Sequence, residues 1–381
     1  MKRFLNISIL AVALVSLCGC EQNENLGNED INISIPKDGY IYFDTEVNSR
    51  GVLIYDYLRE NFSVLGYRYA TSWSSEGSLA SQNSMINTST TMGIFGTEGA
   101  PGVQLVKWGN SAHSYEPVKP WDNSLTYSFF AWYPSDIPSS GSNYIGQPYI
   151  TYTLDTQDPA NHKDVMTACV IDTKSTATKT VSFNMQHRLS AIDIIARSYV
   201  NAEAIDAEEA VKVKINSVSI ELGNILYDGA TIPLNTEDEA NVLQGTSSEG
   251  WNKTLNFSSL VTGVTMDYYS DASKVALLTE VAKKTMILIP QAKALTCKVN
   301  VNYDIVNEEG NAISYNVENG DGTTTTQYYT GIESSSTVSI KELKEGTYYN
   351  LLLNFTKSGI TVQVLKAEAW EEKDDVEHDF E

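Results

Sequence analysis

Short runs in which apolar and polar residues alternate fill most of the chain, and this period of two is typical of β-strands with one buried face. In the first half the runs cover 40–44, 62–69, 103–108, 125–133, 149–154, 164–171, 180–185 and 187–196. In the second half they cover 211–216, 218–222, 286–289, 297–306, 348–355 and 360–365, with a weaker run at 253–260. Tyrosine is abundant, and Pro and Gly punctuate the runs, as in β-sandwiches. The pattern predicts an all-β protein.

Two segments depart from this pattern. Residues 271–284 predict one helix, because Asp271 can cap its N-terminus while Lys283 and Lys284 suit the negative end of the helix dipole. The stretch from Gly320 to Thr326 predicts a loop or the tip of a hairpin.

The length predicts two domains, because a body of about 360 residues exceeds what one hydrophobic core usually supports. Residues 199–210 are small, acidic and poor in large apolar side chains, so the boundary is expected near residue 200. The expected division is an N-terminal β-sandwich over residues 51–200 and a C-terminal β-sandwich over residues 201–381.

The N-terminus carries an export signal. A basic pair at residues 2–3 precedes an apolar run over 4–17, which is too short to span a bilayer but fits the core of a signal peptide. The run ends in Leu-Cys-Gly-Cys at 17–20, the pattern of a lipobox, whose last thiol receives a diacylglyceryl group. We expect residues 1–19 to be a lipoprotein signal peptide and Cys20 to be lipidated, with an ordinary signal peptide and a chance cysteine as the alternative.

The charge argues against nucleic-acid partners, and the cysteines raise the question of a disulfide. The formal net charge is −22, and loss of residues 1–19 removes two basic residues and no acid, which leaves −24. Such a surface repels phosphate backbones, so nucleic-acid binding is not expected. Besides Cys20, the exported chain keeps Cys169 and Cys297. An oxidising compartment permits a bond between them, but two separate buried thiols are favoured.

Candidate catalytic groups are few. The four histidines, His113, His162, His187 and His378, lie in loop, strand-start or tail sequence that favours structural roles. The sequence has no nucleophile elbow, phosphate-binding glycine loop or zinc-protease motif. A calcium-loop alignment at 317–328 puts Val317 and Tyr328 where carboxylates are required. We expect no enzyme activity, cofactor or metal, although a glycosidase pair of carboxylates joined only in space is not recognisable in a sequence.

The aromatic residues allow a further interpretation, in which exposed rings stack on sugars. The candidate tryptophans are Trp73, Trp108, Trp121, Trp132 and Trp251. Aromatic residues at a period of two are more often part of the core, and this applies to Trp108 and Trp132 in particular.

An ordered set of short segments resembles the fimbrillins, the subunits of lipoprotein-derived type V pili on Gram-negative anaerobes. After the lipobox come Asn48-Ser-Arg-Gly51, Phe62-Ser-Val-Leu-Gly-Tyr67, Tyr127-Ser-Phe-Phe-Ala-Trp-Tyr-Pro134, Asp164-Val-Met-Thr-Ala168, Val181-Ser-Phe-Asn-Met-Gln-His-Arg-Leu-Ser190, Ile287-Leu-Ile-Pro-Gln291, Gly346-Thr-Tyr-Tyr349 and the stretch from Val364 to Trp370. The resemblance implies two transthyretin-like β-sandwich domains in tandem and export to the outer membrane as a lipoprotein. It also implies that a surface protease cuts after an arginine and removes the first strand, and that a strand of a neighbouring pilus subunit fills the groove.

The residues before Arg50 suit a removable strand. Ile31, Ile33 and Ile35 alternate with polar residues, and Ile41 and Phe43 keep the same parity, while Pro36 and Gly39 suit an edge position. A sandwich without one strand exposes backbone groups beside an apolar trough, which a strand from another molecule can fill. Residues 20–50 are therefore expected to be a tether and a removable strand, cut between Arg50 and Gly51. Arg59 and Arg68 are weaker alternatives, and Arg50 could also be an exposed loop residue of a permanently anchored protein.

The C-terminal tail bears on the position in a pilus. After Trp370 the only apolar residues are Val376 and Phe380, whereas a donor strand needs more alternating apolar positions. A subunit that accepts a strand but does not donate one belongs at the tip. The sequence thus predicts a fimbrial subunit that supports adhesion, with a lean to the tip. The alternative is a lipid-anchored surface protein that binds glycans.

Overall fold

The computed structural model describes residues 39–46, 60–69, 91–97, 100–139, 148–174, 180–198, 211–237, 241–251, 253–261, 264–268, 279–280, 285–356, 359–365 and 368–369. The regular structure in these ranges is β, apart from one 3-10 turn at Pro159–Asn161. The all-β prediction is confirmed. The helix expected at 271–284 is wrong where it can be compared, because Thr279–Glu280 forms strand β19, and its other residues lie outside the described ranges.

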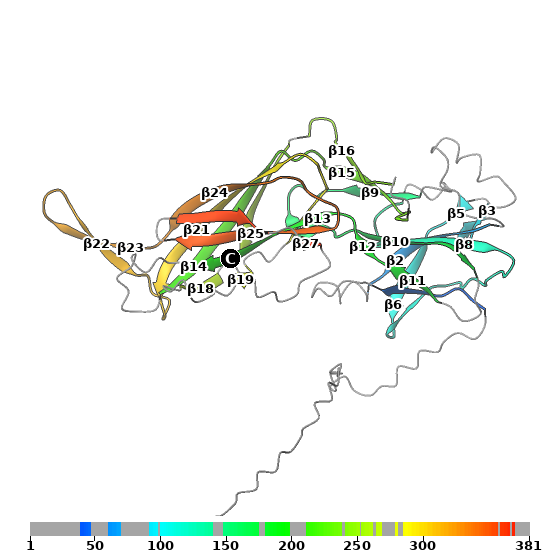
Figure 1. Ribbon diagram of the computed structural model, residues 1–381. Helices are drawn as coiled ribbons and strands as arrows, with labels where there is room; N and C mark the ends of the chain where they lie inside the picture. The colour runs from blue at the N-terminus through cyan, green and yellow to red at the C-terminus, as the bar shows by residue number, and fades with distance from the viewer. Residues whose placement is uncertain are drawn as a thin grey trace, which may run out of the picture. The chain divides into compact units, whose positions relative to one another are not determined.

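The largest sheet has seven strands and comes from the first half of the chain (Figure 1). Its order is β12 (Gln186–His187), β10 (Met166–Lys174), β8 (Thr126–Tyr133), β2 (Phe62–Tyr69), β6 (Gln104–Gly109) and β7 (Ala112–Ser114), with β3 (Thr91–Gly93) also paired to β2. Both faces of β8 are buried, because Tyr127 and Phe129 face one apolar cluster and Phe130 and Trp132 the other. This explains why its sequence is a continuous aromatic run.

Two further sheets hold most of the second half. One consists of β19, β13 (Ser190–Ser198), β25 (Thr347–Thr356) and β26 (Gly359–Val364), together with β20 (Met286–Leu288) and β27 (Glu368–Ala369). The other consists of β17 (Thr254–Val261), β14 (Val211–Gly223), β21 (Leu295–Asn307) and β24 (Ile332–Ile340), together with β18 (Val264–Tyr268). Alternate residues of β14 and β21 are buried in the larger apolar cluster, as the period of two predicts.

Four small sheets complete the fold. They pair β9 (Tyr149–Thr153), β15 (Gly229–Pro233) and β16 (Gln244–Thr246); β22 (Ser314–Glu318) and β23 (Thr324–Tyr328); β4 (Gly96–Thr97) and β5 (Ala100–Pro101); and β1 (Phe43–Glu46) and β11 (Val181–Asn184). The segment from Gly320 to Thr326 includes the tip of the β22–β23 hairpin, as predicted.

The sheets link the two halves of the chain. Strand β13 precedes the boundary expected near residue 200, yet it pairs in parallel with β25. Strand β9 of the first half likewise pairs with β15 of the second. Residues 199–210 lie outside the described ranges, so the division at residues 51–200 and 201–381 stays a prediction.

Candidate functional site

The strand before Arg50 and its neighbours form the candidate site. Residues 39–46 run along one side of the seven-stranded sheet and hydrogen-bond to two different segments. Ile41 N–H donates to the Lys119 carbonyl at 2.8 Å, and the Gly39 carbonyl accepts from Trp121 N–H at 2.9 Å. Beyond residue 41 the strand changes partner and becomes β1, which pairs in parallel with β11 from Phe43 opposite Val181 to Glu46 opposite Asn184. The segment is thus hydrogen-bonded to the 119–121 stretch at its start and to β11 at its end.

Two side chains of this segment enter the smaller apolar cluster. Ile41 is fully buried, and Phe43 is 3% exposed. The Phe43 ring lies among four other rings, with centroid distances of 5.2 Å to Tyr115, 5.2 Å to Phe129, 5.6 Å to Phe183 and 6.1 Å to Phe95. Since burial of an aliphatic or aromatic side chain contributes roughly 1.5–3 kcal/mol, these two residues hold the strand with about 3–6 kcal/mol.

Polar contacts fix the register of the segment. The Tyr115 hydroxyl donates to the Ile41 carbonyl at 2.9 Å, so the ring that flanks Phe43 also anchors the backbone two residues earlier. On the opposite face, the buried His113 of β7 lies 3.4 Å from the exposed Asp44 carboxylate. This hydrogen bond lowers the pKa of Asp44 below its ordinary value. A replacing strand would have to match both an apolar parity and these backbone positions.

The sequence predicted a tether and a removable strand over residues 20–50. The described part of this stretch, residues 39–46, includes β1, which pairs with β11 in a two-stranded sheet. Cys20, Arg50 and Gly51 lie outside the described residues, with Arg50 four positions after the end of β1. Arg59 lies outside them as well. Arg68 belongs to β2, which has neighbours on both edges. Because the backbone at Arg68 is paired on both sides, Arg68 is a poorer cleavage site than an arginine in an unpaired segment.

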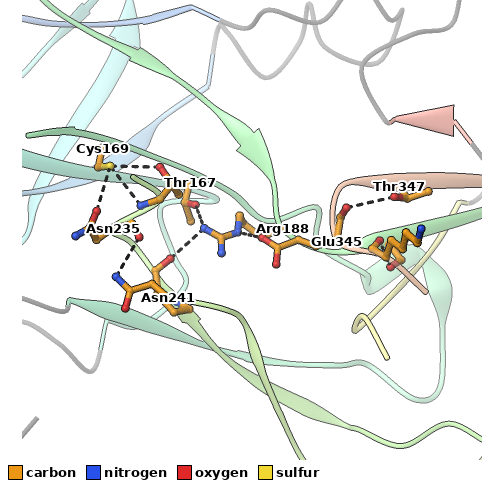
Figure 2. Close-up of polar contacts among 11 residues, drawn as sticks. Thr167, Cys169, Arg188, Asn235, Asn241, Glu345 and Thr347 are labelled. Carbon is orange, nitrogen blue, oxygen red and sulfur yellow. Dashed lines mark hydrogen bonds and ion pairs between the residues drawn. The ribbon is translucent and has the colours of Figure 1, made fainter. Parts of the chain in front are cut away.

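The remaining sheets are joined without help from β1. Figure 2 shows the buried Arg188 guanidinium, which donates to the Thr167 hydroxyl of β10 at 2.9 Å and to the Pro233 carbonyl at the end of β15 at 3.1 Å. It also forms an ion pair with Glu345, in the connection between β24 and β25. One side chain thus connects three parts of the chain that are distant in sequence. These contacts involve no residue of the 39–46 segment.

The other candidate residues have structural roles. The buried His187 ring contacts the Asp164 carboxylate, with Nδ1 and Oδ2 2.8 Å apart, next to the Arg188 network. The His162 ring bridges the Asp155 carbonyl and Ile287 N–H at 2.8 and 2.9 Å. Both Cys169 and Cys297 are free thiols, as favoured from the sequence. His378 lies outside the described residues.

Two searches cover only the described part of the chain. Within it, no three His, Cys, Asp or Glu side chains are grouped closely enough to hold a metal ion. No helix in the same residues has the length and apolar character needed to cross a membrane.

The sequence did not predict two features around the site: the hydrogen-bond network of Arg188 and the pairing of β1 with β11. Arg188 looked like part of an ordinary strand start, although a charged residue between apolar strands is a signal of a buried polar network. The pairing of β1 with β11 joins residues more than a hundred positions apart, and no local pattern specifies it.

Comparisons with known proteins identify the family to which this all-β chain belongs. The family model described as Fimbrillin-like matches residues 80–370, well over half of the chain. The chain belongs to the fimbrillin-like family. This family consists of structural adhesion proteins and not of enzymes, and it implies a location at the cell surface.

A solved structure shares the fold. A fimbrial protein from Bacteroides vulgatus is 19% identical, covers 87% of this chain and 100% of its own, and has a TM-score of 0.57. Candidate cell adhesion proteins from Bacteroides uniformis and Bacteroides ovatus are 16% and 13% identical, cover 88% of this chain, and have lower TM-scores of 0.40 and 0.42. They cover 99% and 98% of their own chains. No curated protein matches the sequence.

Proposed function

We propose that this chain is a fimbrial subunit that assembles by donor-strand exchange and supports cell adhesion. In this proposal it is exported as a lipoprotein through Cys20, and a surface protease cuts between Arg50 and Gly51. The cut releases the segment that ends with β1. A strand from a neighbouring subunit then occupies the groove beside β11.

The observation that carries the proposal is that Ile41 and Phe43 are both buried. They lie two residues apart in a segment whose strand β1 is at the edge of a sheet. Removal of the segment exposes a ring-lined trough and the backbone groups of β11 that paired with it. A strand with apolar residues at positions i and i+2 restores both kinds of contact. The larger apolar cluster and the Arg188 network contain no residue of β1. They stabilise the fold between removal of β1 and binding of the donor strand.

The composition of the tail supports a proposed position in the pilus. Residues 371–381 carry seven acidic side chains and only two apolar ones, Val376 and Phe380. Such a strand would bring carboxylates to a trough lined by aromatic rings, at a large desolvation cost. We therefore propose that the subunit accepts a strand but donates none, and that it sits at the tip. The two expected domains, residues 51–200 and 201–381, are part of the same proposal.

Limited trypsin digestion of the purified chain tests the proposed cut. We expect a fragment whose N-terminus is Gly51, read by mass spectrometry, and no such fragment from an Arg50→Gln variant. An Arg59→Gln variant is the matched control and should be cut normally. A trimmed tip subunit should bind a donor strand without forming ladders in gels, whereas ladders would indicate a shaft subunit. Cleavage that leaves Arg50 intact would contradict the proposal.

A further inference from the structure

An open surface cavity of about 410 Å³ lies beside Trp251, and no residue of β1 is among those that line it. Its lining comes from the turn after β9, the turn between β16 and β17, and β17 itself: Thr156, Gln157, Ser248, Glu249, Trp251 and Asn256. The volume falls near the lower end of the range of about 300–1,000 Å³ that small-molecule sites occupy. The cavity therefore has room for a ligand of one or two rings.

The wall that holds Trp251 is fixed by several hydrogen bonds. Ser248 donates to the Asp228 carboxylate from its backbone N–H, at 2.9 Å, and from its hydroxyl. The Ser247 hydroxyl donates to the Leu226 carbonyl at 2.6 Å. The indole N–H of Trp251 donates to the Ile225 carbonyl at 3.4 Å, so the orientation of the ring is set by the protein.

The opposite wall is fixed as well. Asp155 Oδ1 accepts the backbone N–H of Gln157 at 2.8 Å, which holds the lining residue in a turn. The same turn is tied to the second half of the chain by His162, whose Nδ1 accepts from Ile287 N–H and whose Nε2 then donates to the Asp155 carbonyl. Both walls are ordered before any ligand arrives, which reduces the entropy cost of binding.

The chemistry of the lining selects a class of ligand. Asn256 offers an amide donor and acceptor, and Gln157 offers the same beside its hydrogen bond to Thr156 Oγ1. Glu249 offers an acceptor, Thr156 offers a hydroxyl, and the Ser248 hydroxyl, whose proton goes to Asp228, offers only an acceptor. None of the lining residues is Lys or Arg, and the chain carries a formal net charge of −22, which disfavours phosphate, sulfate and other anions. A ligand that matches one aromatic ring and many uncharged hydrogen-bonding groups has an apolar face and several hydroxyls.

We propose that this cavity binds a neutral carbohydrate, with a pyranose ring against Trp251 and its hydroxyls paired with Gln157, Glu249 and Asn256. Among the tryptophans named from the sequence, Trp132 is 1% exposed and Trp121 packs on Tyr127, while Trp73 lies outside the described residues. Trp108 of β6 packs edge-on against His113 of β7. Trp251 combines an aromatic ring with a polar cavity. The inference names a ligand for the adhesive part of the proposed function and rests on it in that respect.

Binding of a panel of neutral monosaccharides and oligosaccharides to the uncut chain, followed by tryptophan fluorescence and on a glycan array, tests the site. At least one neutral sugar should bind, and Trp251→Ala should weaken it more than about tenfold, a loss of about 1.4 kcal/mol. Gln157→Ala changes only an exposed side chain and should weaken binding without affecting thermal stability. Trp251→Phe keeps an apolar ring in place and should retain part of the affinity. Trp108→Ala, which alters an aromatic residue on β6, is the control and should bind normally.

The results separate this inference from strand exchange. Absence of binding to every neutral sugar, binding that survives Trp251→Ala and Gln157→Ala, or a preference for sulfated glycans would overturn the carbohydrate site. Cleavage at Arg50 and acceptance of a donor strand would be unaffected by these substitutions, so failure of one proposal leaves the other to its own test.

Discussion

Phe43 and Phe183 stack with their ring centroids 5.6 Å apart and their planes inclined by 25°. Their strands, β1 and β11, are also hydrogen-bonded in parallel. The contact between two strands remote in sequence is therefore both a backbone and a side-chain contact. Removal of β1 would therefore expose the face of the Phe183 ring that Phe43 covers.

Replacement of Phe43 by alanine should destabilise the uncut chain strongly. The residue is 3% exposed, and truncation of a buried Phe typically costs about 3–5 kcal/mol. Tyr40→Ala is a suitable control, because Tyr40 belongs to the same segment but is 41% exposed and should change the free energy of unfolding by no more than about 0.5 kcal/mol. Urea unfolding measures both values, and equal effects would mean that Phe43 does not hold the segment.

Replacement of Arg188 should destabilise the fold mainly through its buried hydrogen bonds, because its ion-pair partner Glu345 is exposed. Arg188→Met leaves the Thr167 hydroxyl and the Pro233 carbonyl without their donor, and a buried polar group left unsatisfied costs about 1–3 kcal/mol. In contrast, Lys163 and Asp136 form an exposed pair, so Lys163→Met should cost less than about 1 kcal/mol. Chemical denaturation measures the free energy of unfolding of both variants. A loss for Arg188→Met no larger than that for Lys163→Met would show that the Arg188 hydrogen bonds do not stabilise the fold.

His162 should make stability depend on pH. Burial lowers the pKa of His162 below its ordinary value, because the buried ring resists a charge. The unfolded chain then binds a proton near pH 6.5 that the folded chain does not, so the contribution of His162 is present above that pH and is lost as the pH falls toward the folded pKa.

A His162→Gln variant removes this titration. The difference in unfolding free energy between the unaltered chain and the variant should shrink between pH 8 and pH 5, with a slope of up to about 1.4 kcal/mol per pH unit. Urea unfolding at several pH values measures it. A difference that is constant with pH would show that the ring is not held neutral.

The two internal thiols should remain reduced and slow to react. Burial raises the pKa of Cys169 and raises that of Cys297 to about 12, so little thiolate is present at pH 8. In a chain that begins at Glu21, a colorimetric thiol reagent should label neither residue quickly in the folded state and both in denaturant. Detection of a Cys169–Cys297 disulfide by mass spectrometry would contradict the structure.

Local patterns were sufficient for the strands with strong alternation or continuous aromatic runs, such as β2, β8 and β21. Strand β24 was missed because its inward positions include Ser334 and Ser336. The hydroxyls of these serines accept backbone N–H groups of β26, so their role is apparent only when two distant strands are adjacent. The parallel pairing of β13 with β25 was also not predicted, because it joins strands that are distant in sequence.

The candidate site was only partly predictable. The parity of Ile41 and Phe43 was visible in the sequence and indicated a strand with one apolar face. Its ring neighbours Phe95, Tyr115 and Phe183 come from separate segments that the fold alone brings together. The cavity at Trp251 depends in the same way on turns from both halves of the chain.

The most direct test of a removable and replaceable edge strand is the unfolding temperature of a chain that begins at Gly51, measured with and without a synthetic peptide of residues 37–48. We expect this chain to stay folded, to melt below the uncut protein, and to regain stability when the peptide binds. A Phe43→Ala peptide should bind more than about tenfold more weakly, since the missing ring contributes well over 1.4 kcal/mol. A shortened chain that melts like the uncut protein and binds no peptide, or one that is unfolded with the peptide present, would contradict the account.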